Sequence, residues 1–522
     1  MQDSVGAVRE PLLLSQTNHL PVPGRAARRS GSSFFLHTMK KSLNNKNGLT
    51  REVGLSSATV LVIANMVGTG VFTTSGFILK ELGDPRAMLL CWFFGGLFAL
   101  CGAFCFGELG ARFPKAGGEY VFLRESFGKP VAFLSGWISL FVGFSAPIAA
   151  ASIAFSSYFQ QAFGLPTSGE LVFSPFGIPL ITLSWFNLVA LLVIGLFTVV
   201  HYHGLHTGTR VQNGLTVFKI TLIIVFLAAG FFFGKGSMQH FSSDKSLFAA
   251  FSSEKFAVSL IFVSFAYSGW NAAAYLGGEI KRPEKVLPLA MLAGTLIVTV
   301  LYLLLNVVYV YALPPAAMRG VMEVAAAAGT RLFGTGIGRW LNAAIALGLL
   351  SVISAMILAG PRVYYAMSRD NIFFPLFGKV DATHHTPAHA VGLQAAIAIA
   401  MIVSASYDKL LVYIGFTLSL FAMLTVIGLM RLRRNQTGSL PAYRTWGYPL
   451  IPLIFILGNL WIIYFSVKSR PAPVVWGFIT ITVGLLVYVY FYRKAPRADI
   501  NQPDNSPVVR TLLSDRGEIE LN

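Results

Sequence analysis

The chain has 522 residues, of which 55% are hydrophobic and only 12% are charged. Soluble globular proteins carry about 25% charged residues, so the composition excludes an ordinary soluble domain. The formal net charge of +18 does not indicate nucleic-acid binding, because the basic residues lie between apolar runs and at the termini. Membrane proteins distribute basic residues in this way. The sequence therefore predicts an all-α polytopic membrane protein.

The two ends of the chain differ in composition from its middle. Residues 1–50 are polar and basic and contain no continuous apolar run, so we do not expect a cleavable signal peptide there. We expect a disordered cytoplasmic tail at 1–50 and a second cytoplasmic tail at 496–522. The membrane domain is then expected to occupy residues 51–495.

Twelve apolar runs are near the ~20 residues that a helix needs to cross a bilayer. An even number of spans places both termini on the same side of the membrane. We expect the spans near 56–80, 87–111, 131–161, 180–203, 211–233, 256–279, 287–313, 335–368, 387–405, 409–432, 448–468 and 472–492.

Lysine and arginine show which side holds the termini, since cytoplasmic loops are enriched in both. The segment 162–179, which follows span three, contains neither residue type. Lys235, Lys245 and Arg319 are exceptions that do not reverse the bias. We therefore expect both termini to lie in the cytoplasm and the protein to reside in the cell membrane. The loops on the terminal side contain Arg112, Lys115, Arg124, Lys129, Arg210, Lys281, Arg282, Lys285, Arg369, Lys379, Arg431, Arg433, Arg434 and Arg444.

The first predicted span contains an unusual interruption. Its sequence from Leu61 to Phe72 is LVIANMVGTGVF, with Gly68, Thr69 and Gly70 about a dozen residues into the apolar run. Each glycine costs roughly 0.5–1 kcal/mol relative to alanine in a helix. Lipid cannot satisfy backbone groups that unwinding exposes. The stretch therefore indicates either a polar binding site or a close approach of another helix.

A second interruption occurs in span six, where the segment Ile261–Glu279 reads IFVSFAYSGWNAAAYLGGE. Ser268 and Gly269 lie in the middle of the span and Asn271 follows. Interruptions five helices apart are typical of a five-plus-five inverted repeat, whose equivalent helices break near the membrane midplane to form one site. We expect the repeats at about 56–233 and 256–432, with two extra helices within 448–492.

Two broken helices that face each other would suit a zwitterion. The half-helix after Gly70 would present N–H groups and a positive dipole end to a carboxylate. The half-helix ending near Phe265 and Ala266 would present carbonyl groups to an ammonium. This chemistry predicts recognition of an α-amino acid without a catalytic residue, so we do not expect an enzyme.

Several motifs resemble the amino acid–polyamine–organocation family over about residues 50–495, and FAYSGWN is most similar to its L-type amino acid transporter branch. The resemblance implies a LeuT-like fold of ten core helices plus two, with helices one and six unwound. It also implies alternating access without ATP hydrolysis. The motifs are the GTG of span one, FAYSGWN at Phe265–Asn271, GGEIKRPEKVLP at Gly277–Pro288, FGELGARFPKAGGEY at Phe106–Tyr120 and PRVYYAMSRDNIFFP at Pro361–Pro375.

The resemblance also implies a substrate site. Phe265 stands where the L-type branch has an aromatic gate, although it could be an ordinary core aromatic. Asn271 matches an asparagine near the site, or it makes a hydrogen bond between helices. The family implies no cofactor and no metal. The implied substrate-binding residues are Val67, Gly68, Thr69, Gly70, Phe265, Ala266, Tyr267, Ser268 and Asn271.

Lys219 lies about eight residues into span five, in LTVFKITLIIV. A charge at that depth indicates a function, unless the side chain snorkels to the interface. It falls where many family members have a lysine in place of a sodium ion, beside helices one and eight. Its ammonium could brace helix one, or it could titrate during the cycle and couple transport to protons. Either role makes sodium dependence less expected.

Other polar residues suggest roles outside the substrate site. Glu108, Arg112 and Glu279 could form ion pairs that close a cytoplasmic gate, or they could be solvated loop charges. The histidines have no carboxylate or cysteine nearby, so we expect interfacial or loop residues rather than a metal site. We expect the cysteines to be packing residues. These residues are His201, His203, His206, His384, His385, Cys91, Cys101 and Cys105.

Animal L-type members pair with a glycoprotein through a cysteine between spans three and four. Residues 162–179 contain none, so we expect no disulfide-linked heavy chain and a prokaryote-like permease. The leading hypothesis is a sodium-independent amino-acid exchanger or proton symporter. The alternatives are an amino-acid sensor, a channel, or a transporter of cationic amino acids or polyamines. The short polar tails disfavour a sensor, which would usually carry a soluble output domain. Polar residues occur only locally in spans one and six, which disfavours the continuous polar pore of a channel.

Overall fold

The computed structural model describes residues 51–165, 170–173, 181–202, 205–243, 246–248, 253–381, 386–404, 407–435 and 442–494. The tails predicted at 1–50 and 496–522 lie outside these ranges, as do His203, His384 and His385. The side chain of His206 is likewise outside the described part.

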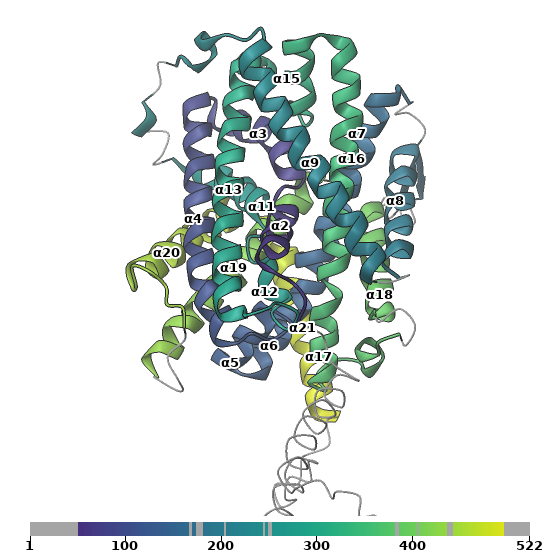
Figure 1. The fold of residues 1–522 in the computed structure, drawn as a ribbon, viewed down its shortest axis with the longest axis vertical. Coiled ribbons are helices and arrows are strands. Elements are labelled where there is room, and N and C mark those ends of the chain that lie inside the picture. The colour runs from purple at the N-terminus through teal and green to yellow at the C-terminus, as the bar shows by residue number, and fades with distance from the viewer. Residues whose placement is uncertain are drawn as a thin grey trace, which may run out of the picture. The chain divides into compact units, whose positions relative to one another are not determined.

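Most described residues are helical (Figure 1). Two short strands form an antiparallel pair, in which Glu170 is opposite Ser184 and Phe173 is opposite Ile181. The elements are α2 (Leu55–Met66), α3 (Thr69–Leu82), α4 (Pro85–Arg112), α5 (Glu119–Phe127), α6 (Lys129–Ile138), the π-helix η1 (Ser139–Ser145), α7 (Ala146–Phe163), β1 (Glu170–Phe173), β2 (Ile181–Ser184), α8 (Trp185–Tyr202), α9 (Leu205–Phe233), the 3₁₀ helix η3 (Met238–Phe241), α11 (Glu254–Tyr267), α12 (Ala272–Tyr275), α13 (Pro283–Ala312), α14 (Pro315–Met318), α15 (Val324–Phe333), α16 (Thr335–Ala359), α17 (Pro361–Arg369), the 3₁₀ helix η4 (Pro375–Gly378), α18 (Ala388–Ser404), α19 (Tyr407–Arg434), α20 (Leu450–Ser469) and α21 (Pro471–Lys494).

Within the described ranges, nine helical segments are long and apolar enough to cross a membrane. Three shorter apolar helices accompany them, at Asn187–Tyr202, Val324–Phe333 and Ala388–Ser404. The chain is therefore a polytopic helical membrane protein, as its composition predicts. The number of twelve spans stays a prediction. The nine segments are Leu55–Leu82, Pro85–Arg112, Lys129–Phe163, Arg210–Phe233, Pro283–Ala312, Thr335–Arg369, Lys409–Arg434, Leu450–Ser469 and Pro471–Phe491.

The predicted start of the fourth span, at residue 180, is wrong. Residues Ile181–Ser184 form strand β2, and helix α8 begins only at Trp185. Isoleucine and threonine at the start of this segment are β-branched and favour extended backbone. The hydroxyl of Ser184 accepts a hydrogen bond from the Asn187 amide at 3.2 Å. This serine cap fixes the helix start where the strand ends.

The third predicted span is helical throughout, but it changes helix type in the middle. The π-helix η1 separates α6 from α7, and Pro147 stands in the first turn of α7. Proline has no N–H, so the carbonyl four residues earlier loses its α-helical partner. Rearrangement of the hydrogen bonds over the preceding residues follows naturally from this loss, and such π segments are common at functional sites.

The interrupted helices lie among longer helices that run roughly parallel to one another. α13 packs against α4 and α2, whereas α16 packs against α7 and α9. α11 packs against α3, which brings the two predicted interruptions together. Figure 1 shows α2 between α13 and α16, with α5 and α6 at the end where α17 also lies. This arrangement places both interruptions in the protein interior.

Candidate functional site

The first glycine-rich stretch separates two helices. α2 ends at Met66 and α3 begins at Thr69, so Val67 and Gly68 lie between them. Gly68 is extended, with φ −115° and ψ −152°, and no side chain caps the first turn of α3. The first N–H groups of a helix lack intrahelical partners and carry the positive end of its dipole. This buried terminus is therefore suited to an anion.

The second stretch leaves helical geometry after Tyr267, where α11 ends, and α12 begins at Ala272. Gly269, between them, has φ +95°, a conformation that side chains disfavour. A Cβ at this position would lie 2.8 Å from the backbone carbonyl carbon of Asn65. The glycine therefore allows the segment to pass directly against α2.

The two interrupted helices also touch through α3. A Cβ added at Gly70 would lie 2.4 Å from Cα of Ala266. The hydroxyl of Tyr302, on α13, is 2.5 Å from the carbonyl oxygen of Met66 and 3.1 Å from that of Ala266. Both carbonyls lie in the last turn of a helix, where intrahelical amide partners run out. Tyr302 therefore contacts the end of each interrupted helix.

We expect Tyr302→Phe to weaken this junction, because the substitution removes the hydroxyl and keeps the ring. The loss of a hydrogen bond at buried carbonyls costs about 1–3 kcal/mol. A lower melting temperature of the purified protein should result. Tyr309→Phe is the matched control, since the buried Tyr309 hydroxyl on the same helix has no hydrogen-bond partner among the described residues. Equal effects of both substitutions would contradict the prediction.

Lys219 is fully buried on α9, where its side chain has 0% exposure. Its ammonium donates hydrogen bonds to the carbonyl oxygens of Ala64, at 3.1 Å, and of Val67. Its aliphatic stem packs on α16, because a Cβ at Gly348 would lie 3.5 Å from Cγ of the lysine. A snorkelling lysine would instead reach an exposed helix end. Lys219 thus joins α9 to the end of α2 through its ammonium and packs on α16 through its stem.

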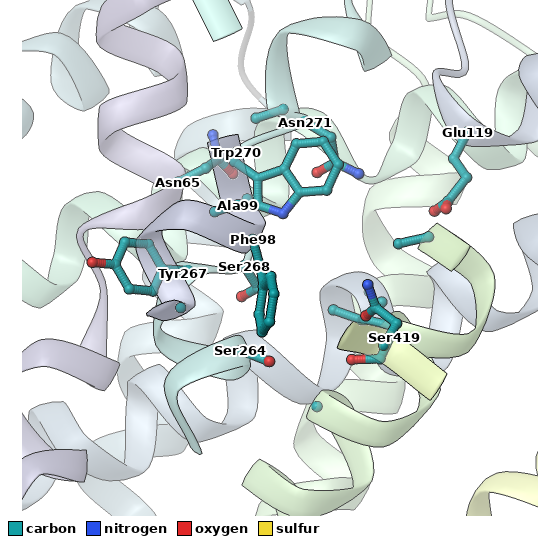
Figure 2. Close-up of a pocket in the computed structure, with 18 of the residues that line it drawn as sticks. Asn65, Phe98, Ala99, Glu119, Ser264, Tyr267, Ser268, Trp270, Asn271 and Ser419 are labelled. Carbon is teal, nitrogen blue, oxygen red and sulfur yellow. The ribbon is translucent and has the colours of Figure 1, made fainter. Parts of the chain in front are cut away.

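A pocket opens beside the second interruption (Figure 2). Three of the predicted substrate-binding residues line it, namely Tyr267, Ser268 and Asn271. Further wall residues are Asn65 of α2 and several aromatic side chains, among them Phe98, Phe144, Trp270, Tyr275 and Phe455. The other predicted residues are buried and do not line this pocket; they are Val67, Gly68, Thr69, Gly70, Phe265 and Ala266.

Two residues of the second interruption, Trp270 and Asn271, have contacts within the protein. Trp270 makes edge-to-face contacts with Phe106, at 4.7 Å between ring centroids, and with Phe455, at 6.1 Å. The Asn271 amide nitrogen lies 3.5 Å from the Tyr275 hydroxyl. Both residues belong to the same segment, so this contact is not the hydrogen bond between separate helices that was the alternative expectation for Asn271.

The structure gives the two predicted gate carboxylates partners that the sequence did not suggest. Glu108 accepts hydrogen bonds from Arg433, on α19, and from the amide of Thr445 at 2.8 Å. Glu279 pairs with Arg362, on α17, at 3.3 Å. Both glutamates are buried, which differs from the solvated-loop alternative. The guanidinium of Arg112 lies over the ring of its neighbour Phe113, at 5.5 Å.

The remaining candidates are in the protein interior. His201 was expected at an interface, yet it is buried on α8, and its Nε2 is 2.9 Å from the Ser354 hydroxyl. This hydrogen bond gives Nε2 a partner on α16. Cys91, Cys101 and Cys105 are buried on α4 and carry free thiols.

Sequence reasoning missed several residues at the site. Tyr302 looks like one more aromatic in an apolar span, and no local pattern distinguishes it. The π-helix supplies Gly143 and Phe144 to the pocket wall, and its one local signal is Pro147. Glu119 also lines the pocket, although the sequence places it in a polar loop. Each of these roles depends on a contact with a distant part of the chain.

Comparisons with known proteins show which family the chain belongs to. The profile of the family described as amino acid permease matches residues 53–491. The serine/threonine exchanger SteT of Bacillus subtilis is 30% identical over 421 residues, which cover 80% of this chain and 91% of the relative. The mouse b(0,+)-type amino acid transporter 1 is 28% identical, over 85% of this chain and 88% of the relative. The human large neutral amino acids transporter small subunit 2 is 28% identical, over 85% and 82% respectively.

The family match covers most of the chain, and the relatives are transporters or exchangers by name. These findings confirm the resemblance that the motifs of spans one and six indicated. The chain therefore belongs to the amino acid permease family and is an amino acid transporter.

Proposed function

We propose that this protein is a secondary active transporter that works by alternating access, without sodium, as an exchanger or a proton symporter. The observation that carries the proposal is the contact between the two interrupted helices, at Gly70 and Ala266. It brings a free helix N-terminus beside a helix C-terminus inside a membrane protein. Alternating access needs such a central site, which can be exposed to one side at a time.

In this proposal the substrate binds through its backbone atoms. Its carboxylate accepts hydrogen bonds from the uncapped first turn of α3, after Gly68. Its ammonium contacts carbonyl groups at the end of α11, near Phe265. The adjoining pocket, with Ser268 and Asn271 in its wall, receives the side chain. The selection among amino acids then depends on the pocket rather than on the helix ends.

Lys219 supports the sodium-independent part of the proposal. A sodium ion in proteins is held by oxygen atoms, and backbone carbonyls at a helix break can supply them. The Lys219 ammonium already occupies the carbonyls of Ala64 and Val67. A fixed positive charge at that position leaves a sodium ion neither ligands nor a favourable potential.

The remaining architectural predictions belong to the same proposal. The fold is a LeuT-like inverted repeat at about 56–233 and 256–432 with extra helices within 448–492, twelve helices in all. Both termini and the two tails face the cytoplasm. The ion pairs of Glu108 and Glu279 then lie on the cytoplasmic side, where they would close the inner gate.

Small neutral amino acids are the first substrates to test, because one relative is by name a serine/threonine exchanger. The pocket wall offers hydroxyl and amide groups, such as Ser419 and Asn459, that could bind a substrate hydroxyl. We also propose that the protein works without a disulfide-linked heavy chain. Its cysteines are buried on α4 and are therefore not placed for a bond to a partner.

Uptake by reconstituted protein tests the proposal. Purified protein in proteoliposomes should take up labelled L-serine or L-threonine with saturable kinetics, and sodium should not change the rate. Acceleration by unlabelled substrate inside the vesicles indicates exchange, whereas acceleration by an inward proton gradient indicates symport. Substrate binding without flux, or flux that requires sodium, would contradict the proposal.

A further inference from the structure

Glu119 is an acidic residue in the pocket wall that the ion-pair network does not include. It is the first residue of α5, and only 5% of its surface is exposed. Among the described residues, no lysine, arginine or histidine forms an ion pair with it. Figure 2 shows its carboxyl group on the side of the pocket where Asn271 and Ser419 lie, away from Tyr267. A buried carboxylate without a basic partner is costly unless it is protonated.

Among the described residues, the Glu119 carboxyl group has one hydrogen-bond partner, Thr425. When Thr425 donates, this bond lowers the pKa of the carboxyl group, although burial raises it by more. The Thr425 hydroxyl oxygen, on α19, lies 3.0 Å from Oε1 of Glu119 and 2.9 Å from the carbonyl oxygen of Phe421. A hydroxyl has a single proton to donate, yet it has two acceptors here. If Thr425 donates to Phe421, a protonated Glu119 can in turn donate to the Thr425 hydroxyl. A neutral Glu119 that donates to Thr425 satisfies all three groups.

The start of α5 is joined directly to the second interrupted helix. The amide of Gly117 donates to the carbonyl of Tyr275, at 3.1 Å, and Ala116 forms a bridge with Leu276. Gly118 has φ +53°, and a Cβ there would lie 2.6 Å from the ring of Tyr275. The position of Glu119 is therefore tied to α12, the short helix that follows the interruption. A change in charge at Glu119 would act on the same segment that carries Asn271.

The other titratable or charged groups nearby are engaged elsewhere or are exposed. Tyr275, on α12, lies near Glu119 and carries no positive charge that could form an ion pair with it. From α19, Arg433 pairs with Glu108 and Arg431 lies over the Phe127 ring. On the elements next to Glu119 in the chain, Arg124 pairs with Glu125 and Asp370, Lys115 pairs with Glu125, and Lys129 is exposed at the start of α6.

We propose that Glu119 is a proton-binding site of the transport cycle, placed between the substrate pocket and the cytoplasmic gate. The inference rests on the proposed function and makes it specific, because it assigns the coupling proton to this carboxyl group. In the closed arrangement of α5, α12 and α19, where Glu119 is buried, the acid form is stable. When the gate opens, water solvates the carboxyl group, its O–H bond breaks, and the proton passes to water on the cytoplasmic side.

The sign of the pH dependence follows from burial. Burial raises the pKa of Glu119 from its usual value to about 7 in this closed arrangement. A hydrated carboxyl group in the open arrangement has the lower pKa of an ordinary glutamate, about 4.3. The closed arrangement is therefore favoured at low pH, and it loses that advantage as the pH rises toward the pKa of the buried group. Glutamine at this position should hold the neutral state at every pH.

Two measurements on the full-length protein test the proposal. The first is the infrared carbonyl-stretching band of a protonated carboxylic acid, followed from about pH 5 to about pH 9, a range that brackets a raised glutamate pKa. We expect a band in the wild type that disappears with a midpoint near neutral pH, and we expect Glu119→Gln to lack it. The second is L-serine counterflow in proteoliposomes, which should vary several-fold with pH in the wild type and should be nearly independent of pH in the variant.

Controls separate the possible failures. Glu125→Gln changes an exposed carboxylate on the same helix and should retain both the band and the wild-type pH dependence. Glu119→Asp keeps an acid at the site and should keep a titrating band, so a folding defect of the glutamine variant does not decide the outcome. An unchanged band in Glu119→Gln, or unchanged pH dependence of its counterflow, would overturn the proposal. The absence of any L-serine flux in the wild type would contradict the proposed function instead, because the infrared band is measured without transport.

Discussion

Replacing Lys219 with alanine is expected to abolish amino acid uptake while the protein still inserts into the membrane. The ammonium donates hydrogen bonds to the carbonyls of Ala64 and Val67, and no other described lysine or arginine contacts these atoms. Hydrogen bonds from a charged group contribute about 1.5–3 kcal/mol each. The loss of two such bonds when α2 and α3 rearrange would slow transport by roughly 100-fold or more. Initial uptake rates, normalised to reconstituted protein, measure the effect.

Two further variants separate charge from packing. Lys219→Met keeps a long side chain against Gly348 but removes the ammonium, so it should be as inactive as the alanine variant. Lys235→Ala removes a lysine that lies two residues beyond α9, and it should transport like the wild type. Full activity of the methionine variant would mean that the stem, rather than the charge, supports the broken helix.

Local signals in the sequence were sufficient to predict a helical membrane protein and the positions of the two helix interruptions. Paired glycines in an apolar run are costly in a helix, and a lysine in an apolar run is costly in a membrane. The sequence therefore marks Gly68, Gly70, Gly269 and Lys219 without knowledge of the neighbours. The boundary of α8 was wrong because strand β2 depends on pairing with β1, a contact that no pattern within β2 itself indicates.

The partners of the site could not be predicted in the same way. Arg433 is more than 300 residues from Glu108, and Tyr302 is more than 200 residues from Met66. The sequence contains many charged and aromatic residues, so a single sequence does not indicate which pairs of them are in contact in the fold. The burial of Glu119 likewise depends on α12 and α19, which cover a segment that reads as a polar loop.

Gly68 and Gly70 look equivalent in the sequence, yet the structure distinguishes them. A Cβ at Gly68 would lie 3.6 Å from the nearest side-chain atom of Val352, which is ordinary contact. A Cβ at Gly70 would lie 2.4 Å from Cα and 2.5 Å from Cβ of Ala266. At Gly68 there is room for a methyl group, and the backbone conformation is one that alanine can adopt. Gly70 forms the closest contact between the two interrupted helices.

We therefore expect Gly70→Ala to eliminate transport and Gly68→Ala to retain most of it. Overpacking of a core costs typically about 1–3 kcal/mol, and more where the obstructing atoms belong to a backbone that cannot rotate away. At Gly70 the obstruction is the backbone of α11, so the helices must separate to admit the methyl group. Separation would displace the N–H groups of α3 from the carbonyls of α11, and one amino acid could no longer contact both.

Substrate binding to purified protein distinguishes this explanation from a simple folding defect. The Gly70→Ala protein should be monodisperse in detergent but should lose affinity for labelled L-serine, because the distance between its two half-sites has changed. Ala266→Gly, combined with Gly70→Ala, removes one methyl group from the same contact and should recover part of the binding. Wild-type affinity of Gly70→Ala alone would show that the contact between α3 and α11 is not needed for the amino acid site.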